Sequence, residues 1–217
     1  MERYFTLDKF NTWFDWHLIL TGKDITPPEP KTNYIELDGM NGSMDLSETL
    51  TGEITYKDRT VTATFWTDYG NVNDRYNLFR EITTALHGKK IKIVEPDDPT
   101  HYFYGRAKIK SFTNILPYAE FTIEFTCEPW RYAINETNRK IDVNNETINT
   151  VIFNNGVKTL IPIIEITGTI DITFNNATTT LHDGTFKISS VKLKRGSNVV
   201  GVSGTGSVNF RYTECDV

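Results

Sequence analysis

The chain has 217 residues, of which 38% are hydrophobic and 12% aromatic, so it exceeds one average domain and has enough apolar material for a folded core. Its formal net charge is −5, with Lys and Arg interspersed among acids, which argues against binding nucleic acid through the phosphates. No apolar run is long enough for a membrane-spanning helix, and charges occupy the opening segment where a signal peptide needs apolar residues, so we expect folding in a cytoplasm.

From residue 34 onward the chain alternates apolar and polar residues with a period of two, which is typical of half-buried strands. The alternation predicts strands at residues 34–37, 52–56 and 60–66. A short polar turn at residues 57–59 separates the last two runs. We therefore predict a hairpin at that position.

One segment departs from this period and predicts the only helix, at residues 73–86. Its apolar positions recur every three or four residues, Asn73 or Asp74 can cap its start, and Gly88 follows as a stop signal. An amphipathic helix needs an apolar surface to cover, so this helix is expected to pack on a sheet.

Strands resume after the helix at residues 90–94, 101–110 and 120–127, with a turn at 95–99. Pro129 is expected to end the last of them. Residues 135–149 are rich in Asn, Thr, Glu and Lys, and we interpret them as a domain junction with a short strand near 141–143.

The remainder of the chain is a series of short predicted strands separated by Asn- and Gly-rich turns. The closing segment predicts two strands, 199–203 and 207–212, joined by a turn at Gly204 and Gly206. This spacing is typical of an all-β sandwich. The expected fold is therefore mostly β: an α+β amino-terminal domain with one helix on a bent sheet or barrel, then an all-β sandwich.

Constellations that could support catalysis or metal binding are weak. The four histidines have no HxxxH or HxH spacing, and Cys127 and Cys215 are far apart, so both cysteines are interpreted as structural thiols. Alternation on exposed strand faces explains the carboxylate pairs, which are Glu36 with Asp38 and Glu120 with Glu124. We expect no enzyme activity, no metal and no cofactor.

Several segments occur in the order found in the distal tail proteins of long-tailed phages, and the chain resembles that family over nearly its whole length. The segments are an early aromatic strand with Trp13, Phe14 and Trp16, the proline-rich run 26–31, the segment 34–42, the helix, the turn at 96–99, the aromatic strand 102–104, the run 121–129, residues 162–168 and the closing segment 193–212. Asp38 stands where that family usually has proline.

The resemblance implies a structural protein at the tail tip of a virion. Residues 1–133 would form the ring, or belt, domain and residues 134–217 a galectin-like sandwich. The implied assembly is a homo-hexamer that contacts the tail tube protein, the tail-associated hub or fibre protein and the tape measure protein, with no nucleic acid and no membrane. Candidate anchors of the core or of the interface are Trp13, Trp16, Trp66 and Trp130.

The alternative function is a carbohydrate-binding module that contacts the host cell wall, because galectin-like sandwiches stack aromatic rings on sugars. No tryptophan follows Trp130, and the remaining aromatic residues occupy alternating strand positions suited to a core. The sequence therefore favours the structural role.

Overall fold

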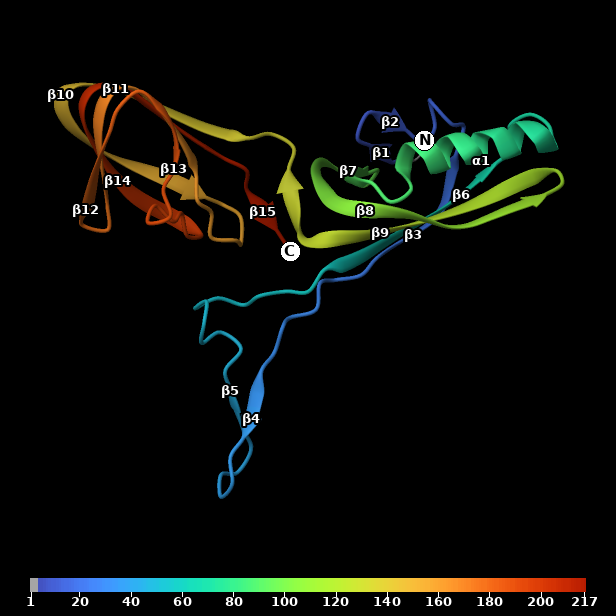
Figure 1. Ribbon diagram of the computed structural model, residues 1–217, viewed down its shortest axis with the longest axis horizontal. Helices are drawn as coiled ribbons and strands as arrows, with labels where there is room; N and C mark the ends of the chain where they lie inside the picture. Colours follow the sequence, from blue (N-terminus) through green and yellow to red (C-terminus); the bar gives the residue numbers. More distant parts are fainter. Residues whose placement is uncertain (1–3) are drawn as a thin grey trace. The chain divides into compact units, whose positions relative to one another are not determined.

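In the computed structural model, which describes residues 4–217, the chain forms two compact units. The first unit runs to Arg131 and includes Val217, and the second is Tyr132–Asp216. Figure 1 shows both units as mostly β, with a single helix in the first, as expected for the fold class.

Seven strands of the first unit form a sheet in the order β2-β1-β7-β8-β9-β6-β3. The strands are β1 (Thr6–Leu7), β2 (Phe10–Asn11), β3 (Ile19–Ile25), β6 (Arg59–Thr67), β7 (Lys90–Glu95), β8 (Asp98–Ile115) and β9 (Tyr118–Ala133). The eighth strand of this sheet, β15 (Cys215–Asp216), belongs to the second unit and pairs with the last residues of β9. Strand β6 shows the predicted alternation most clearly, since Val61, Ala63 and Phe65 are fully buried.

The predicted helix is confirmed as α1 (Val72–Leu86). Its cap is Asn71, one turn before Asp74, and the two side chains exchange hydrogen bonds with each other's backbone N–H groups in a capping box. The helix buries Leu78, Ile82 and Leu86 in the core of the first unit. The apolar stripe read from the sequence is therefore the face that covers the sheet.

Three local predictions in the first unit are wrong. Residues 12–16 form turns instead of an aromatic strand, because Asn11 Oδ1 accepts hydrogen bonds from the N–H groups of Trp13 and Phe14. The segment 52–56 contains only one bridge, between Tyr56 and Pro30, and β6 pairs with β3 and β9 instead of forming the expected hairpin.

Strand β9 also continues beyond Pro129, which was expected to end it. The ladder between β6 and β9 ends at the pair Arg59 and Cys127. Pro129 lies beyond the end of that ladder, so it removes none of the hydrogen bonds between β6 and β9.

The second unit is a five-stranded sheet in the order β10-β14-β11-β12, with β13 also paired to β11. The strands are β10 (Thr137–Asn154), β11 (Ile163–Phe174), β12 (Ala177–Leu181), β13 (Gly184–Lys187) and β14 (Gly196–Tyr212). The strands are longer than predicted. The expected turn at Gly204 and Gly206 lies inside β14, and most of the expected junction 135–149 belongs to β10.

The backbone of β11 approaches β14 so closely that only glycine fits at two positions inside β14. Gly204 and Gly206 have φ angles of 115° and 137°, and a Cβ at Gly206 would lie 1.9 Å from the Thr167 carbonyl oxygen. The neighbouring strand β10 has a bulge at the same level, with Asn145 at a φ of 52°. Gly168 of β11, which pairs with Gly206, also has a positive φ of 92°, so the adjacent strands β10, β14 and β11 are irregular at the same level.

A bend at this level lets one sheet act as a sandwich. Val143 and Val208 lie on one side of the bend, Val200 and Ile172 lie on the other, and all four belong to a single buried cluster. Sandwich cores are otherwise built from two facing sheets. Here the two halves of the same long strands provide both faces.

Replacing Gly206 with alanine is expected to destabilise the second unit by about 3 kcal/mol or more, since a backbone clash adds to the strain of the positive φ. Gly196→Ala is the matched control, because Gly196 has a φ of 90° but open space around its Cβ position. It should cost only about 1 kcal/mol. Chemical denaturation of both variants measures the difference, and equal losses would contradict the close-approach explanation.

Both cysteines are buried and unpaired with each other. Burial raises the pKa of Cys127 to about 12 and that of Cys215 to about 11, so both remain protonated thiols near neutral pH. We expect no reaction with a thiol-specific reagent at pH 8 in the folded protein and two reactive thiols per chain in denaturant. Rapid labelling of either thiol under native conditions would show that the site opens.

Candidate assembly surfaces

The segment 26–58, which we call the arm, leaves the sheet of the first unit between β3 and β6 (Figure 1). Its two legs are held together by backbone hydrogen bonds, from Lys31 N to Thr55 O at 2.8 Å and from Lys57 N to Glu29 O at 2.8 Å. Farther out, β4 (Tyr34–Glu36) and β5 (Ser43–Asp45) form a two-stranded ribbon. The predicted strand at 34–37 is thus part of the arm.

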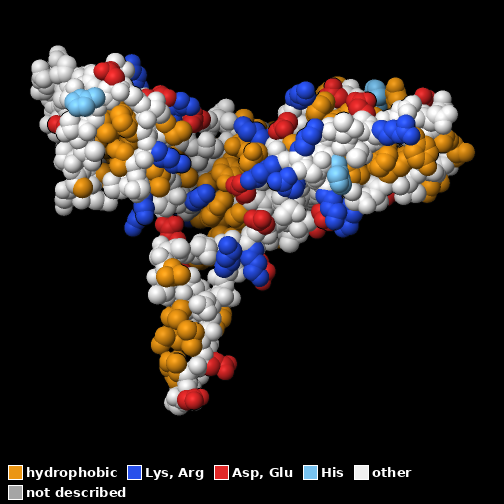
Figure 2. All heavy atoms as spheres, in the orientation of Figure 1, with side chains coloured by type: hydrophobic (Ala, Val, Ile, Leu, Met, Phe, Trp, Pro, Cys, Tyr) orange, Lys and Arg blue, Asp and Glu red, His pale blue; other side chains and the backbone are white. Residues whose placement is uncertain are grey.

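The ribbon of the arm has one apolar face. Ile35 pairs directly with Met44, and the two side chains are 40% and 42% exposed. Leu37, two residues beyond Ile35, is also exposed, as are Leu50 and Ile54 nearer the base of the arm. Figure 2 shows hydrophobic side chains along the arm. An isolated two-stranded ribbon is marginally stable in water, so an uncovered apolar face indicates contact with another chain.

The arm also carries a negative charge. Between residues 31 and 55 the only basic residue is Lys31, whereas the acidic residues are Glu36, Asp38, Asp45, Glu48 and Glu53. Hydrogen bonds from Ser47 lower the pKa of the Asp45 carboxyl, which therefore stays ionised at neutral pH. A surface that receives the arm is expected to combine apolar residues with positive charge.

A second exposed apolar group lies at the tip of the β8–β9 hairpin, where Ile115, Leu116 and Tyr118 are 52%, 74% and 39% exposed. Buried Arg75 of α1 fixes this tip: its Nε donates to Asn114 Oδ1 at 2.9 Å and its Nη1 to the Pro117 carbonyl oxygen at 3.1 Å. The apolar tip is therefore held rigidly against the helix, as a preorganised contact surface would be.

The four tryptophans occupy different environments. Trp16 is a core residue, 1% exposed, and its Nε1 donates to Glu81 Oε1 at 3.0 Å. The other three are half-buried and pack edge-on against other rings: Trp13 on His17, Trp66 on Tyr118 and Trp130 on Tyr56. Trp66 thus adjoins the β8–β9 tip and Trp130 contacts the base of the arm. Their role as interface anchors stays a prediction.

The carboxylates that line a pocket of about 240 Å³ beside Trp16 already have structural roles. Asp15 accepts from Asn11 N, Asp74 accepts from Asn71 N, and Glu81 accepts from Trp16. Over residues 4–217, no group of three or more His, Cys, Asp or Glu side chains is placed to hold a metal ion. No helix in that range is both long and apolar enough to cross a membrane.

In the second unit, three of the aromatic residues expected in the core are buried, namely Phe174, Phe210 and Tyr212. Tyr132 and Phe186 are half-buried, and Phe153 on β10 is 55% exposed. Phe153 lies on the face of β10 opposite to the face that carries the buried neighbour Ile152. The expectation that Phe153 is internal is therefore wrong. Val151 and Val199, which pair across β10 and β14, are also exposed.

Comparison with known proteins agrees with this architecture. Residues 17–127 match the model of the phage tail protein RIFT-related domain, Sipho_tail. The fold is also similar to the crystal structure of the SPP1 Dit (gp 19.1) protein, described as a paradigm of the hub adsorption apparatus in phages that infect Gram-positive bacteria. The TM-score is 0.75 at 13% sequence identity, with 100% of each chain covered. No curated protein matches the chain.

The resemblance to the distal tail family that the sequence indicated is therefore confirmed in fold over the whole chain and in family over the first unit. The matched family region contains the arm, the helix and most of the eight-stranded sheet. This chain belongs to the phage tail protein RIFT-related domain family.

Proposed function

We propose that this protein is a non-enzymatic distal tail protein that forms a hexameric ring at the tail tip, joining the tail tube to the adsorption apparatus. The observation that carries the proposal is the apolar face of the arm, formed by Ile35, Leu37 and Met44, which no part of residues 4–217 covers. The tail-protein family and the fold shared with a hub protein support it.

A closed ring requires a heterologous interface, in which one surface of a copy meets a different surface of the next. The arm provides the first of these surfaces, and the body of the first unit in the neighbouring copy provides the second. Ile35 and Met44 are 40% and 42% exposed, so covering them would stabilise each contact by about 0.6–1.2 kcal/mol per side chain. Six such contacts act together in a closed ring.

In this proposal the first unit forms the ring and contacts the tail tube protein, the hub or fibre protein and the tape measure protein. The second unit is carried on the outside as a packing module. The protein is synthesised and assembled in the host cytoplasm and then resides in the virion tail tip.

The test is a double charge substitution on the arm, Ile35→Asp with Met44→Asp, in phage particles that supply the other tail proteins. We expect tails without the ring, because two carboxylates cannot be buried in an apolar contact. Ser43→Asp is the matched control, since Ser43 lies on the opposite face of the ribbon. Electron microscopy of the tails measures the outcome, and an intact ring in the double variant would refute the role of the arm.

Carbohydrate binding by the second unit is the alternative, and the exposed ring of Phe153 is the feature that favours it. Binding of the protein to a glycan array or to bacterial cell walls, lost on Phe153→Ala, would establish that function. We expect no binding, and we also expect no clearing when the protein is tested for cell-wall cleavage in a zymogram.

A further inference from the structure

The base of the arm contains a pocket of about 230 Å³ that the assembly surfaces described above do not include. It lies within the first unit, and Pro27 and Pro28 of the arm, Phe103 of β8 and the side chains of Arg59, Glu95 and Arg131 line it. The pocket therefore combines an apolar rim with two guanidinium groups.

Arg59 is 5% exposed, and its Nε has no hydrogen-bond partner among residues 4–217. Its guanidinium lies over the Phe103 ring, 5.4 Å from the centroid. Burial, and next the positive charge of Arg131, lower the pKa of Arg59. A buried cation is costly without a counter-charge, so this position favours an anion.

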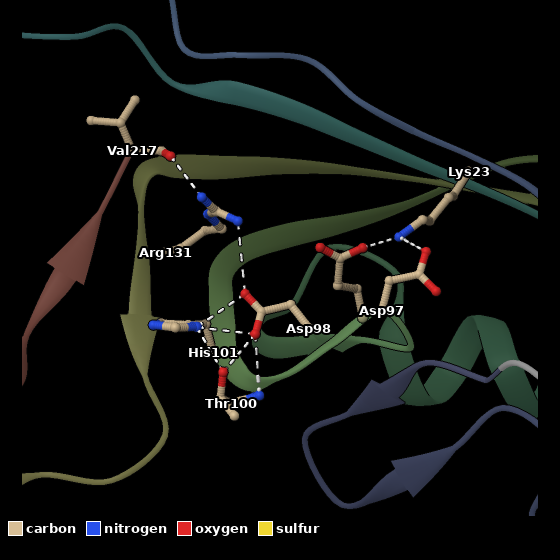
Figure 3. A network of polar contacts seen from close by, with 8 residues as sticks. Lys23, Asp97, Asp98, Thr100, His101, Arg131 and Val217 are labelled. Atoms are coloured by element: carbon tan, nitrogen blue, oxygen red, sulfur yellow. Dashed lines mark hydrogen bonds and ion pairs between the residues drawn. The ribbon is translucent and has the colours of Figure 1, made fainter.

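The carboxylates around the pocket are engaged with Lys23, His101 and Arg131. Lys23 binds both Glu95 and Asp97, the latter at 2.8 Å. Asp98 lies 3.0 Å from the His101 ring and 3.7 Å from Arg131 Nη1. Figure 3 shows this network, in which Arg131 lies between Asp98 and the Val217 carbonyl oxygen. None of these pairs includes Arg59.

Arg131 adds a second positive charge to the same pocket, which Val217 also lines. Its Nη2 donates to the Val217 carbonyl oxygen at 3.1 Å. Two guanidinium groups lining one small cavity favour a planar anion such as a carboxylate.

We propose that this pocket binds a carboxylate on a short alkyl stem, with Arg59 and Arg131 as the charged partners of the carboxylate and Pro27, Pro28 and Phe103 around the stem. The presence of Glu95 in the lining disfavours a doubly charged ion such as sulfate or phosphate. The carboxylate has two sources, a free small anion or an acidic side chain of a neighbouring chain. The second source rests on the proposed ring, whereas the first does not.

The direct test follows the Nε–H signals of the arginines by nuclear magnetic resonance in the isolated wild-type chain, titrated with butyrate, acetate and sulfate. Arg59→Lys assigns the Arg59 signal. We expect a saturable shift of that signal, with butyrate binding more tightly than acetate and sulfate more weakly than either. Chloride at the same ionic strength should leave the signal unchanged. An unsaturable shift, or the same shift with chloride, would overturn the site.

Two variants test which residues hold the anion. Arg131→Gln should weaken butyrate binding at least about tenfold, because a hydrogen bond to a charged group is lost. Arg80→Gln is the matched control, since Arg80 is an exposed arginine of the helix in the same unit. Equal affinity in wild type and Arg131→Gln would contradict the proposed pair.

Tail assembly distinguishes the two sources. If a neighbouring chain supplies the carboxylate, Arg59→Gln should reduce incorporation into tails about tenfold. If the ligand is a free anion, incorporation should equal that of wild type while the titration still saturates. The titration uses the isolated chain, so failure of the ring leaves this test of the pocket intact.

Discussion

An apolar sheet face must be covered, and the two large sheets of this chain meet that requirement in two different ways. In the first unit the helix does so, with Leu78, Ile82 and Leu86 packed into the core. In the second unit the sheet covers itself by bending. The ribbon of the arm has neither solution within residues 4–217, since Ile35 and Met44 stay exposed. An apolar face left uncovered in this way is typical of a surface that contacts a second chain.

The arm and its base also differ in charge. The arm has an excess of carboxylates, whereas its base contains Arg59, a buried cation whose Nε has no partner in the described chain. In a head-to-tail assembly, opposite charges on different surfaces select one relative orientation of neighbouring copies. Apolar burial would supply most of the affinity in such a contact, and the charges would supply its direction.

Buried arginines have two distinct uses in the first unit. The guanidinium of Arg75 donates to Asn114 and to two backbone carbonyl oxygens, those of Gly70 and Pro117, which ties the helix to the β8–β9 tip. That of Arg59 lies on an aromatic ring beside a pocket. Arg75 therefore holds two elements together, whereas Arg59 is a candidate binding group. Both are buried, but the hydrogen-bond acceptors near them differ.

The sequence by itself determined the elements whose signals are local. Alternation identified β6, the apolar stripe and stop signal identified α1, and the order of motifs identified the family. Asn71 was missed as the cap because Asn73 and Asp74 are equally good capping residues. The arm was visible only as a strand at 34–37, since local alternation does not reveal whether a face is covered.

Tertiary structure alone decided the features that depend on distant neighbours. Gly204 and Gly206 have the composition of a turn, yet they lie inside a strand because the Thr167 and Thr169 carbonyl oxygens approach too closely for a side chain. The environment of Arg59 depends on Phe103 and Arg131, which are remote in sequence. Periodicity indicates on which face of its strand a side chain lies, whereas tertiary packing determines which residues it contacts on that face.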